Sequence, residues 1–301
     1  MPKTLICIVG PTAIGKTTLA IDIAKQISTE IISSDSRQFY KEMTIGTAKP
    51  SLEEMKEIPH HFIDNLSIHD NYSVGNFERD ALLKIDELFD KKNEIIMVGG
   101  SGLYEKAVTE GLDNFPEVDS QIRVDLKSIL ENEGVESLQN LLKEKDPKYY
   151  SEVDIFNTQR IIRALEICIG TGKTFSSFRQ NKISERNFSI LKIGLIADRE
   201  IMYSRINQRV EIMFENGFLN EAEKLFPYKN LNALNTVGYK ELFAYFEGKY
   251  SLEFAKEEIK KNTRRFAKRQ LTWYNKDTSI HWFNINNVSK IKDFIAKTIL
   301  K

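Results

Sequence analysis

A glycine-rich stretch near the start of the chain has the residue types that hold phosphate. Residues 10–17 read GPTAIGKT and fit the pattern G-x-x-x-x-G-K-S/T. In such a loop the backbone N–H groups point at anionic oxygens, the lysine adds a mobile positive charge, and the hydroxyl of the last residue can bind Mg²⁺. The predicted loop consists of Gly10, Pro11, Thr12, Ala13, Ile14, Gly15, Lys16 and Thr17. The stretch predicts a site for a polyphosphate or a diphosphate.

The flanking sequence gives this loop the right context. The apolar run 5–9 before it is typical of a buried strand. Apolar residues after it recur at helical spacing, which predicts a helix from about Gly15. The positive end of that helix dipole adds to the attraction for an anion. An ordinary glycine turn is the weaker alternative.

A second group of candidate residues concerns the chemistry done on the phosphate. P-loop proteins that hydrolyse nucleotides normally carry an Asp at the tip of a later strand, where it holds magnesium. The expected strand 94–98 ends instead in Gly99-Gly100-Ser101-Gly102, which argues against an ordinary ATPase or GTPase. The expected strand 30–34 does lead into a carboxylate, Asp35. Because strands of an open α/β sheet bind ligands at their carboxyl ends, these segments should share one crevice with the loop. Asp35 could hold a metal-bound water, accept a proton, or merely cap the turn with Ser36.

Composition limits the classes of protein that the chain can be. With 301 residues it can form one large domain or two ordinary ones. No apolar run approaches the roughly 20 residues that cross a bilayer, so no membrane contact is predicted. The expected strand so near residue 1 leaves no room for a leader peptide, and a cytoplasmic protein is expected. Cys7 and Cys168 are predicted to be buried thiols, and no Cys/His cluster predicts zinc. A monomer is expected because no exposed apolar helix stands out.

The charge is zero overall but unevenly distributed. Residues 112–155 are acidic, whereas 256–276 are strongly basic. Helical spacing there arranges the basic side chains in two neighbouring stripes, which we expect to lack compensating glutamates. Ile259 and Phe266 should face a core. Two such stripes favour a track for nucleic-acid phosphates over a merely solvated face. The stripes are Lys260, Arg264 and Lys268, and Lys261, Arg265 and Arg269.

The pattern of strands and helices predicts an α/β fold. We expect a P-loop NTPase-like parallel sheet core with a helical insertion domain. Residues 1–115 and 185–301 should form the discontinuous core, and 116–184 the helical insertion. The expected strands are 4–9, 30–34, 94–98, 190–196 and 280–283, and helices are expected at 16–27, 74–91 and through much of 116–182.

Several blocks in a fixed order resemble one family. These blocks are GPTAIGKT (10–17), DSRQFY (35–40), IGTAKP (45–50), PHHFID (59–64), VGGSGLY (98–104), QRIIRALE (159–166), VGYKE (237–241) and TRRFAKRQLTW (263–273). The chain resembles the tRNA dimethylallyltransferases, also called tRNA isopentenyltransferases, almost from end to end. The resemblance implies transfer of a dimethylallyl group from dimethylallyl diphosphate to the exocyclic amine of the adenine 3′-adjacent to the anticodon. Ser101 stands where the family usually has Thr, and the zinc-finger extension of eukaryotic members is missing, which suggests the bacterial type.

The resemblance also assigns roles in the reaction. The loop, Lys16 and Mg²⁺ on Thr17 would stabilise the departing diphosphate. Asp35 would accept the proton of the adenine amine, and Thr12 would touch both the diphosphate and the reacting region. The family's arginine contact to the diphosphate falls on Arg205 or Arg209, of which Arg209 is preferred. The implied catalytic residues are Thr12, Lys16, Asp35 and Arg209.

The resemblance also implies that the insertion 116–184 contacts the anticodon region of tRNA, and a second set of residues would bind this partner. The adenine must leave its stack to reach such a crevice, and unpaired loop nucleotides are where proteins read RNA sequence. Arg163 could instead simply pair with Glu166 along its helix. The implied tRNA contacts are Asp35, Ser36, Arg37, Gln38, Ser101, Arg123, Gln159, Arg160, Ile161, Ile162 and Arg163, with the basic helix following the stem.

Two other classes of protein remain as alternatives. A small-molecule P-loop kinase, which binds ATP, would share the features of the first hundred residues. A non-catalytic RNA-binding protein with a vestigial P-loop would tolerate loss of Lys16, Thr17 or Asp35, all of which are present. The basic helix argues against the kinase, and the intact crevice argues against the binding protein.

Overall fold

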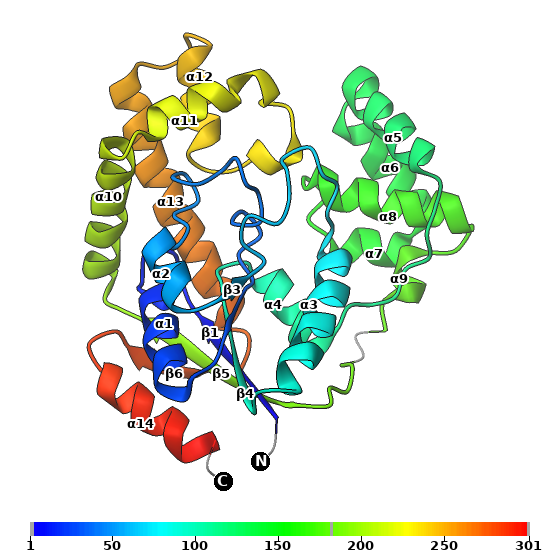
Figure 1. Cartoon of the computed structure of the whole chain (residues 1–301). Helices are drawn as coiled ribbons and strands as arrows, with labels where there is room; N and C mark the ends of the chain where they lie inside the picture. Colours follow the sequence, from blue (N-terminus) through cyan, green and yellow to red (C-terminus); the bar gives the residue numbers. More distant parts are fainter. Residues whose placement is uncertain (1–2, 181–182, 300–301) are drawn as a thin grey trace. The chain divides into compact units, whose positions relative to one another are not determined.

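The chain folds into two compact units. The computed structural model describes residues 3–180 and 183–299; residues 1–2, 181–182 and 300–301, which include the end of the expected helical stretch, lie outside the described residues. The core unit comprises Met1–Glu110 and Glu185–Lys301, and the helical unit comprises Gly111–Ser184 (Figure 1). The core unit is therefore built from two stretches of sequence that the helical unit separates.

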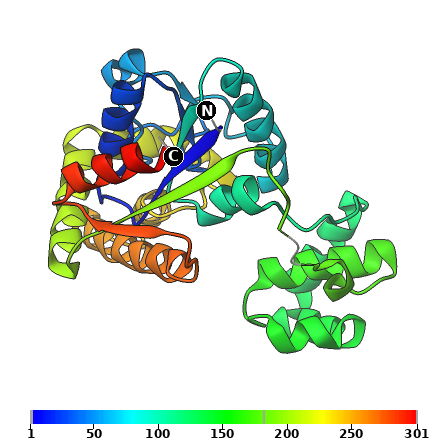
Figure 2. The same cartoon turned by 90° about the horizontal axis from the view of Figure 1, so that it is seen from below.

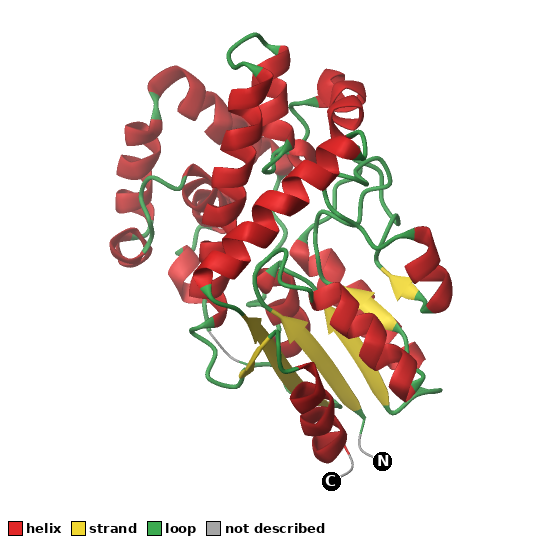
Figure 3. Cartoon of the chain, turned by 90° about the vertical axis from the view of Figure 1, so that its left-hand side faces the viewer, coloured by secondary structure: helices red, strands yellow, loops and turns green. Residues whose placement is uncertain are grey.

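A parallel sheet forms the centre of the core unit. Its described strands run in the order β3-β2-β4-β1-β5-β6, and every pairing is parallel (Figure 3). Ile6 of the central strand lies between Ile96 and Leu191. Strand β1 is buried along its whole length, as expected for a parallel sheet covered on both faces. The predicted α/β fold with a P-loop NTPase-like core is confirmed. The strands are β1 (Thr4–Val9), β2 (Ile31–Ser33), β3 (His60–His61), β4 (Glu94–Val98), β5 (Ser189–Ile196) and β6 (His281–Asn284).

Helices cover each face of this sheet. The face that carries Ile6 and Ile8 packs against α1 (Lys16–Ile27) and α14 (Val288–Ile299), which lie on the same side of the strands (Figure 2). The opposite face, with Leu5, packs against α3 (Val74–Phe89) and α4 (Gly102–Glu110). Alternating strand residues therefore belong to two separate apolar clusters, and this fixes the register of the sheet.

A third apolar cluster lies among the later helices of the core unit. Its helices are α10 (Arg199–Glu215), α11 (Phe218–Leu225), α12 (Tyr239–Phe246) and α13 (Leu252–Tyr274), while α2 (Leu52–Glu57) is a separate short helix. Tyr40 and Met43, which follow β2, are buried in this cluster. The cluster thereby fixes the segment after β2 against α11 and α12. None of the helices in the described residues is both long enough and apolar enough to span a bilayer.

The helical unit has a core of its own. It contains α5 (Ser120–Glu133), α6 (Val135–Lys145), α7 (Pro147–Glu152), α8 (Thr158–Thr171) and α9 (Phe175–Phe178). Leu126, Leu138 and Leu142 pack there against α8. Ile161 and Ile162 belong to this core, with side chains 0% and 1% exposed, so the expectation that they contact tRNA is wrong for their side chains. Cys168 is also buried here, and Cys7 is buried in β1, which confirms both as buried thiols.

Candidate active site

The phosphate loop follows β1 and leads directly into α1. Gly10 has φ +139°, and a Cβ at this position would lie 2.7 Å from the carbonyl oxygen of Leu195. Gly15, with φ +102°, is the left-handed residue before the helix, which begins at Lys16. Both positions therefore require glycine, the first for close approach to β5 and the second for its backbone conformation. The predicted order of strand, loop and helix is confirmed.

Lys16 points back into its own loop. Its Nζ donates to the carbonyl oxygens of Gly10 at 3.0 Å and Pro11 at 2.7 Å. Burial lowers the pKa of Lys16 to about 7; the Asp35 carboxylate opposes this shift and Arg209 adds to it. An anion bound at the loop would favour the protonated lysine.

The carboxyl ends of β2 and β4 meet beside this loop, as the sequence predicts. A Cβ on Gly99 would lie 2.6 Å from the backbone carbon of Ser34, so only glycine lets the two strands approach this closely. Asp35 follows β2, and its Oδ1 accepts a hydrogen bond from the N–H of Arg37 at 3.1 Å. Asp35 thus also caps its turn, and among the described residues no hydrogen bond to its Oδ2 is found.

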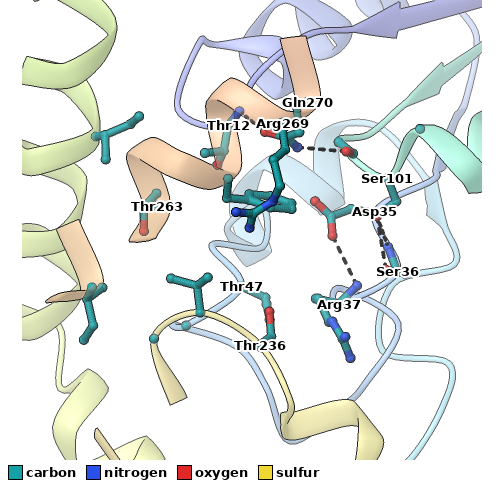
Figure 4. Close-up of a pocket in the computed structure, with 18 of the residues that line it drawn as sticks. Thr12, Asp35, Ser36, Arg37, Thr47, Ser101, Thr236, Thr263, Arg269 and Gln270 are labelled. Atoms are coloured by element: carbon teal, nitrogen blue, oxygen red, sulfur yellow. Dashed lines mark hydrogen bonds between the residues drawn. The ribbon is translucent and has the colours of Figure 1, made fainter. Parts of the chain in front are cut away.

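Gln270 of α13 joins two of these segments, although sequence analysis gave it no role. Its Oε1 accepts from the N–H of Thr12 at 2.8 Å, and its Nε2 donates to the carbonyl oxygen of Gly100 at 2.8 Å (Figure 4). The side chain is only 6% exposed. Gln270 therefore fixes the P-loop to the glycine turn after β4 through two buried hydrogen bonds.

Two cavities meet at these residues. The phosphate cavity, of about 470 Å³, is lined by the P-loop from Thr12 to Thr18, together with Arg205 and Val98. The acceptor cavity, as we call the second, is about 560 Å³ and is lined by Ser36, Ser101 and residues 235–238 (Figure 4). Both cavities share one set of lining residues, which makes this set the boundary between them. The shared residues are Thr12, Asp35, Arg209, Phe266 and Gln270.

Both candidate arginines of α10 reach the P-loop. Arg209 donates from Nη1 to Oγ1 of Thr12 at 3.3 Å, and Arg205 donates from Nε to the carbonyl oxygen of Ala13 at 2.9 Å. Of the two, only Arg209 lines both cavities. Phe266, which was expected to face a core, is 38% exposed and lines both cavities, so that expectation is wrong.

Four of the predicted RNA contacts lie together in the core unit. Ser36 donates from its N–H to Oγ of Ser101 at 3.1 Å, and both side chains line the acceptor cavity. The Arg37 guanidinium donates to the carbonyl oxygen of Ala233 at 2.8 Å. Gln38 is buried, and its Oε1 accepts from Oγ of Ser33 at 3.1 Å. Gln38 therefore supports the wall of the site, whereas Ser36, Arg37 and Ser101 face the cavity.

Two of the three predicted arginines of the helical unit share one buried carboxylate. Glu166 pairs with Arg123 at 3.1 Å and with Arg163 at 3.5 Å. Glu166 is 4% exposed, whereas the side chains of Arg123 and Arg163 are 43% and 46% exposed. The alternative pairing of Arg163 with Glu166 is therefore present. Because two arginines face one glutamate, this group of three side chains keeps one net positive charge. Gln159 and Arg160 are exposed at the start of α8.

The basic stripes on α13 are partly neutralised, contrary to expectation. Lys260 pairs with Glu257 at 2.7 Å and with Glu211 at 2.6 Å. Lys261 pairs with Glu258. These glutamates lie three residues earlier on α13 or, for Glu211, on α10, so the expectation that the stripes lack compensating glutamates is wrong. Around a shallow surface depression of about 340 Å³ lie Arg265, Lys268, Arg269 and Thr272.

The fold and the site together define a class of protein. The parallel sheet carries a P-loop after its central strand, and no carboxylate stands at the tip of β4. The phosphate cavity opens onto a second cavity, and an Asp and an Arg stand at their boundary. This arrangement is that of a P-loop enzyme that brings a phosphate-bearing donor to a separate acceptor.

Comparison with known proteins identifies the family. Residues 38–277 match the family model described as IPP transferase. The tRNA dimethylallyltransferase of Christiangramia forsetii is 59% identical over 300 residues, which cover 99% of each chain. The solved tRNA isopentenylpyrophosphate transferase of Bacillus halodurans is 36% identical, with a TM-score of 0.73 and coverage of 99% of this chain and 97% of that one. A solved eukaryotic dimethylallyltransferase acting on tRNA is 28% identical, with a TM-score of 0.80 and coverage of 95% and 75%. The chain belongs to the tRNA dimethylallyltransferase family, which confirms the predicted resemblance.

Proposed function

We propose that this chain transfers a dimethylallyl group from dimethylallyl diphosphate to the exocyclic amine of the adenine 3′-adjacent to the anticodon of tRNA, and releases diphosphate. Prenyl transfer to tRNA is the activity of the family to which it belongs. The small-molecule kinase is not favoured, because the relatives that match almost the whole chain are tRNA prenyltransferases.

The observation that supports this proposal best is the meeting of the two cavities. The phosphate cavity has the loop N–H groups, Lys16 and Arg209 for the diphosphate. The acceptor cavity reaches the same boundary at Asp35. A donor and an acceptor that enter from different cavities would meet between Thr12 and Asp35.

The chemistry follows from this geometry. The bond between C1 of the dimethylallyl group and the diphosphate oxygen breaks, and the electron pair leaves with the diphosphate. Loop N–H groups, Lys16 and Arg209 stabilise the charge that builds on the leaving group. The adenine amine forms the new bond to C1, and its proton passes to the carboxylate of Asp35. Alignment of amine, C1 and leaving oxygen is the main contribution of the protein.

Mg²⁺ is part of the proposal, with Thr17 as its protein ligand. Among the described residues no group of three or more His, Cys, Asp or Glu side chains could hold a metal ion. Mg²⁺ commonly keeps several waters and binds through few protein groups plus substrate phosphates, so the Thr17 hydroxyl in the phosphate cavity fits that mode. The ion would neutralise charge on the departing diphosphate.

Recognition of tRNA involves both units in this proposal. The flipped adenine enters the acceptor cavity, where Ser36, Arg37 and Ser101 contact it or its neighbour. Arg123 and Arg163, anchored by Glu166, hold phosphates of the anticodon loop. We also expect the enzyme to act as a cytoplasmic monomer, which sedimentation and cell fractionation would test.

A transfer assay tests the proposal. Purified protein, Mg²⁺ and radiolabelled dimethylallyl diphosphate are incubated with tRNA from a strain that lacks this modification, with labelled ATP as a parallel donor. Label at the adenine beside the anticodon is the expected result. Absence of label from tRNA, with phosphate transfer from ATP to a small molecule, would move the chain to the kinase class.

A further inference from the structure

A carboxylate on α11 organises one loop of the acceptor cavity. Oε2 of Glu221 accepts hydrogen bonds from the N–H groups of Thr44 at 3.0 Å and Ile45 at 2.8 Å. Oε1 accepts from the N–H of Gly46 at 2.9 Å. Consecutive N–H groups that converge in this way form an anion-binding concavity, which is filled here by the protein's own carboxylate. Glu221 therefore fixes the backbone of residues 44–46.

A fourth hydrogen bond connects this carboxylate to α12. The hydroxyl of Tyr239, a fully buried residue, donates to Oε1 of Glu221 at 2.6 Å. Burial and the neighbouring Glu221 raise the pKa of Tyr239 above its usual value, so the hydroxyl stays protonated and can donate. Each carboxylate oxygen then accepts two hydrogen bonds, which fills its ordinary acceptor capacity.

The backbone of this loop also packs closely against α11 and α12 at Gly46. A Cβ on Gly46 would lie 2.4 Å from the ring of Phe218 and 2.5 Å from the hydroxyl of Tyr239. On the other side, Thr47 donates from Oγ1 to the carbonyl oxygen of Met43 at 2.7 Å. Close packing and this internal hydrogen bond therefore support the loop as a wall of the cavity.

This arrangement matters because two walls of the acceptor cavity depend on it. Gly46 and Thr47 line the cavity, and so do residues 235–238, which Tyr239 directly follows. Thr47 and Thr236, one from each wall, are labelled in Figure 4. Glu221 lines neither cavity, yet it bonds to residues of the first wall and to the residue next to the second.

We propose that Glu221 is a positioning residue for the acceptor: it holds the two walls at the spacing that admits the flipped adenine. This inference rests on the proposed function and deepens it. The groups that bind the diphosphate, namely the P-loop and Arg209, have no hydrogen bond to Glu221 among those of the described residues. Loss of the Glu221 carboxylate should therefore weaken the use of tRNA and not of the donor.

The decisive variant is Glu221→Gln, because it keeps the shape of the side chain. Its NH₂ group would face backbone N–H donors in place of one oxygen, so the loop must shift. We expect the KM for tRNA to rise at least about tenfold, in line with the loss of one or two buried hydrogen bonds. The KM for dimethylallyl diphosphate should stay within about twofold of the native value, since its site is untouched.

Two further variants make the test specific. Tyr239→Phe removes a single hydrogen bond to the same carboxylate and should raise the KM for tRNA less, in the same direction. Glu223→Gln changes an exposed carboxylate of the same helix and should behave as the native enzyme. Unfolding by urea is followed for all three, so that a loss of folded protein is measured separately.

The outcomes separate the two proposals. A native KM for tRNA in both Glu221→Gln and Tyr239→Phe would overturn the positioning role, as would an equal rise in the KM of both substrates. If the native chain transferred no label to tRNA, the proposed function itself would fail before this comparison is made.

Discussion

Replacing Gln270 with methionine isolates the contribution of one buried amide. Gln270→Met keeps a similar side-chain volume and removes both hydrogen bonds, to the N–H of Thr12 and to the carbonyl oxygen of Gly100. A buried group left without its partner costs about 1–3 kcal/mol, so two such groups set a limit of about 2–6 kcal/mol. Because two cavities border this site, water can partly solvate the two backbone groups that lose their partner. We expect the free energy of unfolding to fall by about 2 kcal/mol.

The same change should also slow the transfer step. Thr12 stands at the boundary of both cavities, and its N–H is fixed by Gln270. A misplacement of about 1 Å can cost about 100-fold in rate when alignment dominates. We therefore expect the single-turnover rate of Gln270→Met to fall between about 10-fold and 100-fold.

The measurements are single-turnover transfer at saturating substrates and unfolding in urea. Gln26→Met, an exposed position on α1, serves as the matched control and should leave both quantities unchanged. A Gln270→Met enzyme with a rate within about twofold of the native value would refute the argument that this amide aligns the P-loop with the acceptor side.

Three other perturbations test separate parts of the site and its support. Asp35→Asn should lower the single-turnover rate by about 100-fold to 10,000-fold while tRNA binding stays near native; near-normal turnover would exclude Asp35 as the base. Because the pKa of Lys16 is lowered to about 7, most of this lysine is neutral at pH 8 and should become protonated when dimethylallyl diphosphate binds. Binding to the native protein should therefore take up nearly one more proton than binding to Lys16→Arg, whose arginine stays charged. Calorimetry in buffers of different ionisation enthalpy measures the proton uptake, and equal uptake by the two proteins would contradict the lowered pKa. Lys192 pairs with Glu105 at 3.1 Å and with Asp277 at 2.7 Å in the core. Lys192→Met leaves these carboxylates unpaired and should lower the free energy of unfolding, measured in urea, by about 3–5 kcal/mol. An unchanged urea midpoint would show that these ion pairs do not stabilise the fold.

The direction in which Lys16 changes stability with pH follows from its depressed pKa. Between about pH 7 and the usual lysine value of 10.5, the folded protein holds Lys16 neutral while the unfolded chain holds it protonated. The unfolded state then binds more protons, so the contribution of this group to stability rises with pH in that window. An anionic ligand reverses the preference because it stabilises the charged lysine, and proton uptake is the direct sign of that reversal.

Local sequence patterns were sufficient for the P-loop and for the described strands of the sheet other than β3, a two-residue strand that was not expected. The expected strands 4–9 and 94–98 match β1 and β4, and the expected helix 16–27 matches α1. These elements carry their own signals, since apolar runs and helical periodicity depend on neighbours in sequence. The same is true of the loop 10–17, whose pattern is itself local.

The residues that were missed act over long distances in the chain. Gln270 bonds to Thr12, which lies 258 positions earlier, and no local pattern marks such a pair. Glu221 likewise reads as an ordinary glutamate of an amphipathic helix. Ile161 was carried over with its neighbours from a family motif, although helical periodicity places it toward the core of the helical unit. Where a family motif covers both faces of a helix, helical periodicity separates its buried positions from its exposed ones.

The separation of Thr12 from Gln270 has a consequence for how the enzyme is made. On the ribosome, β1 and the P-loop emerge before the helical unit, and α13 emerges after it. Central strand β1 also waits for β5, which pairs with it along its whole length across nearly 190 residues of chain. Such distant pairing slows folding, because a long loop must close before its contacts form. The nascent chain therefore holds an unfinished P-loop until α13 has emerged, because only then can Gln270 bond to Thr12.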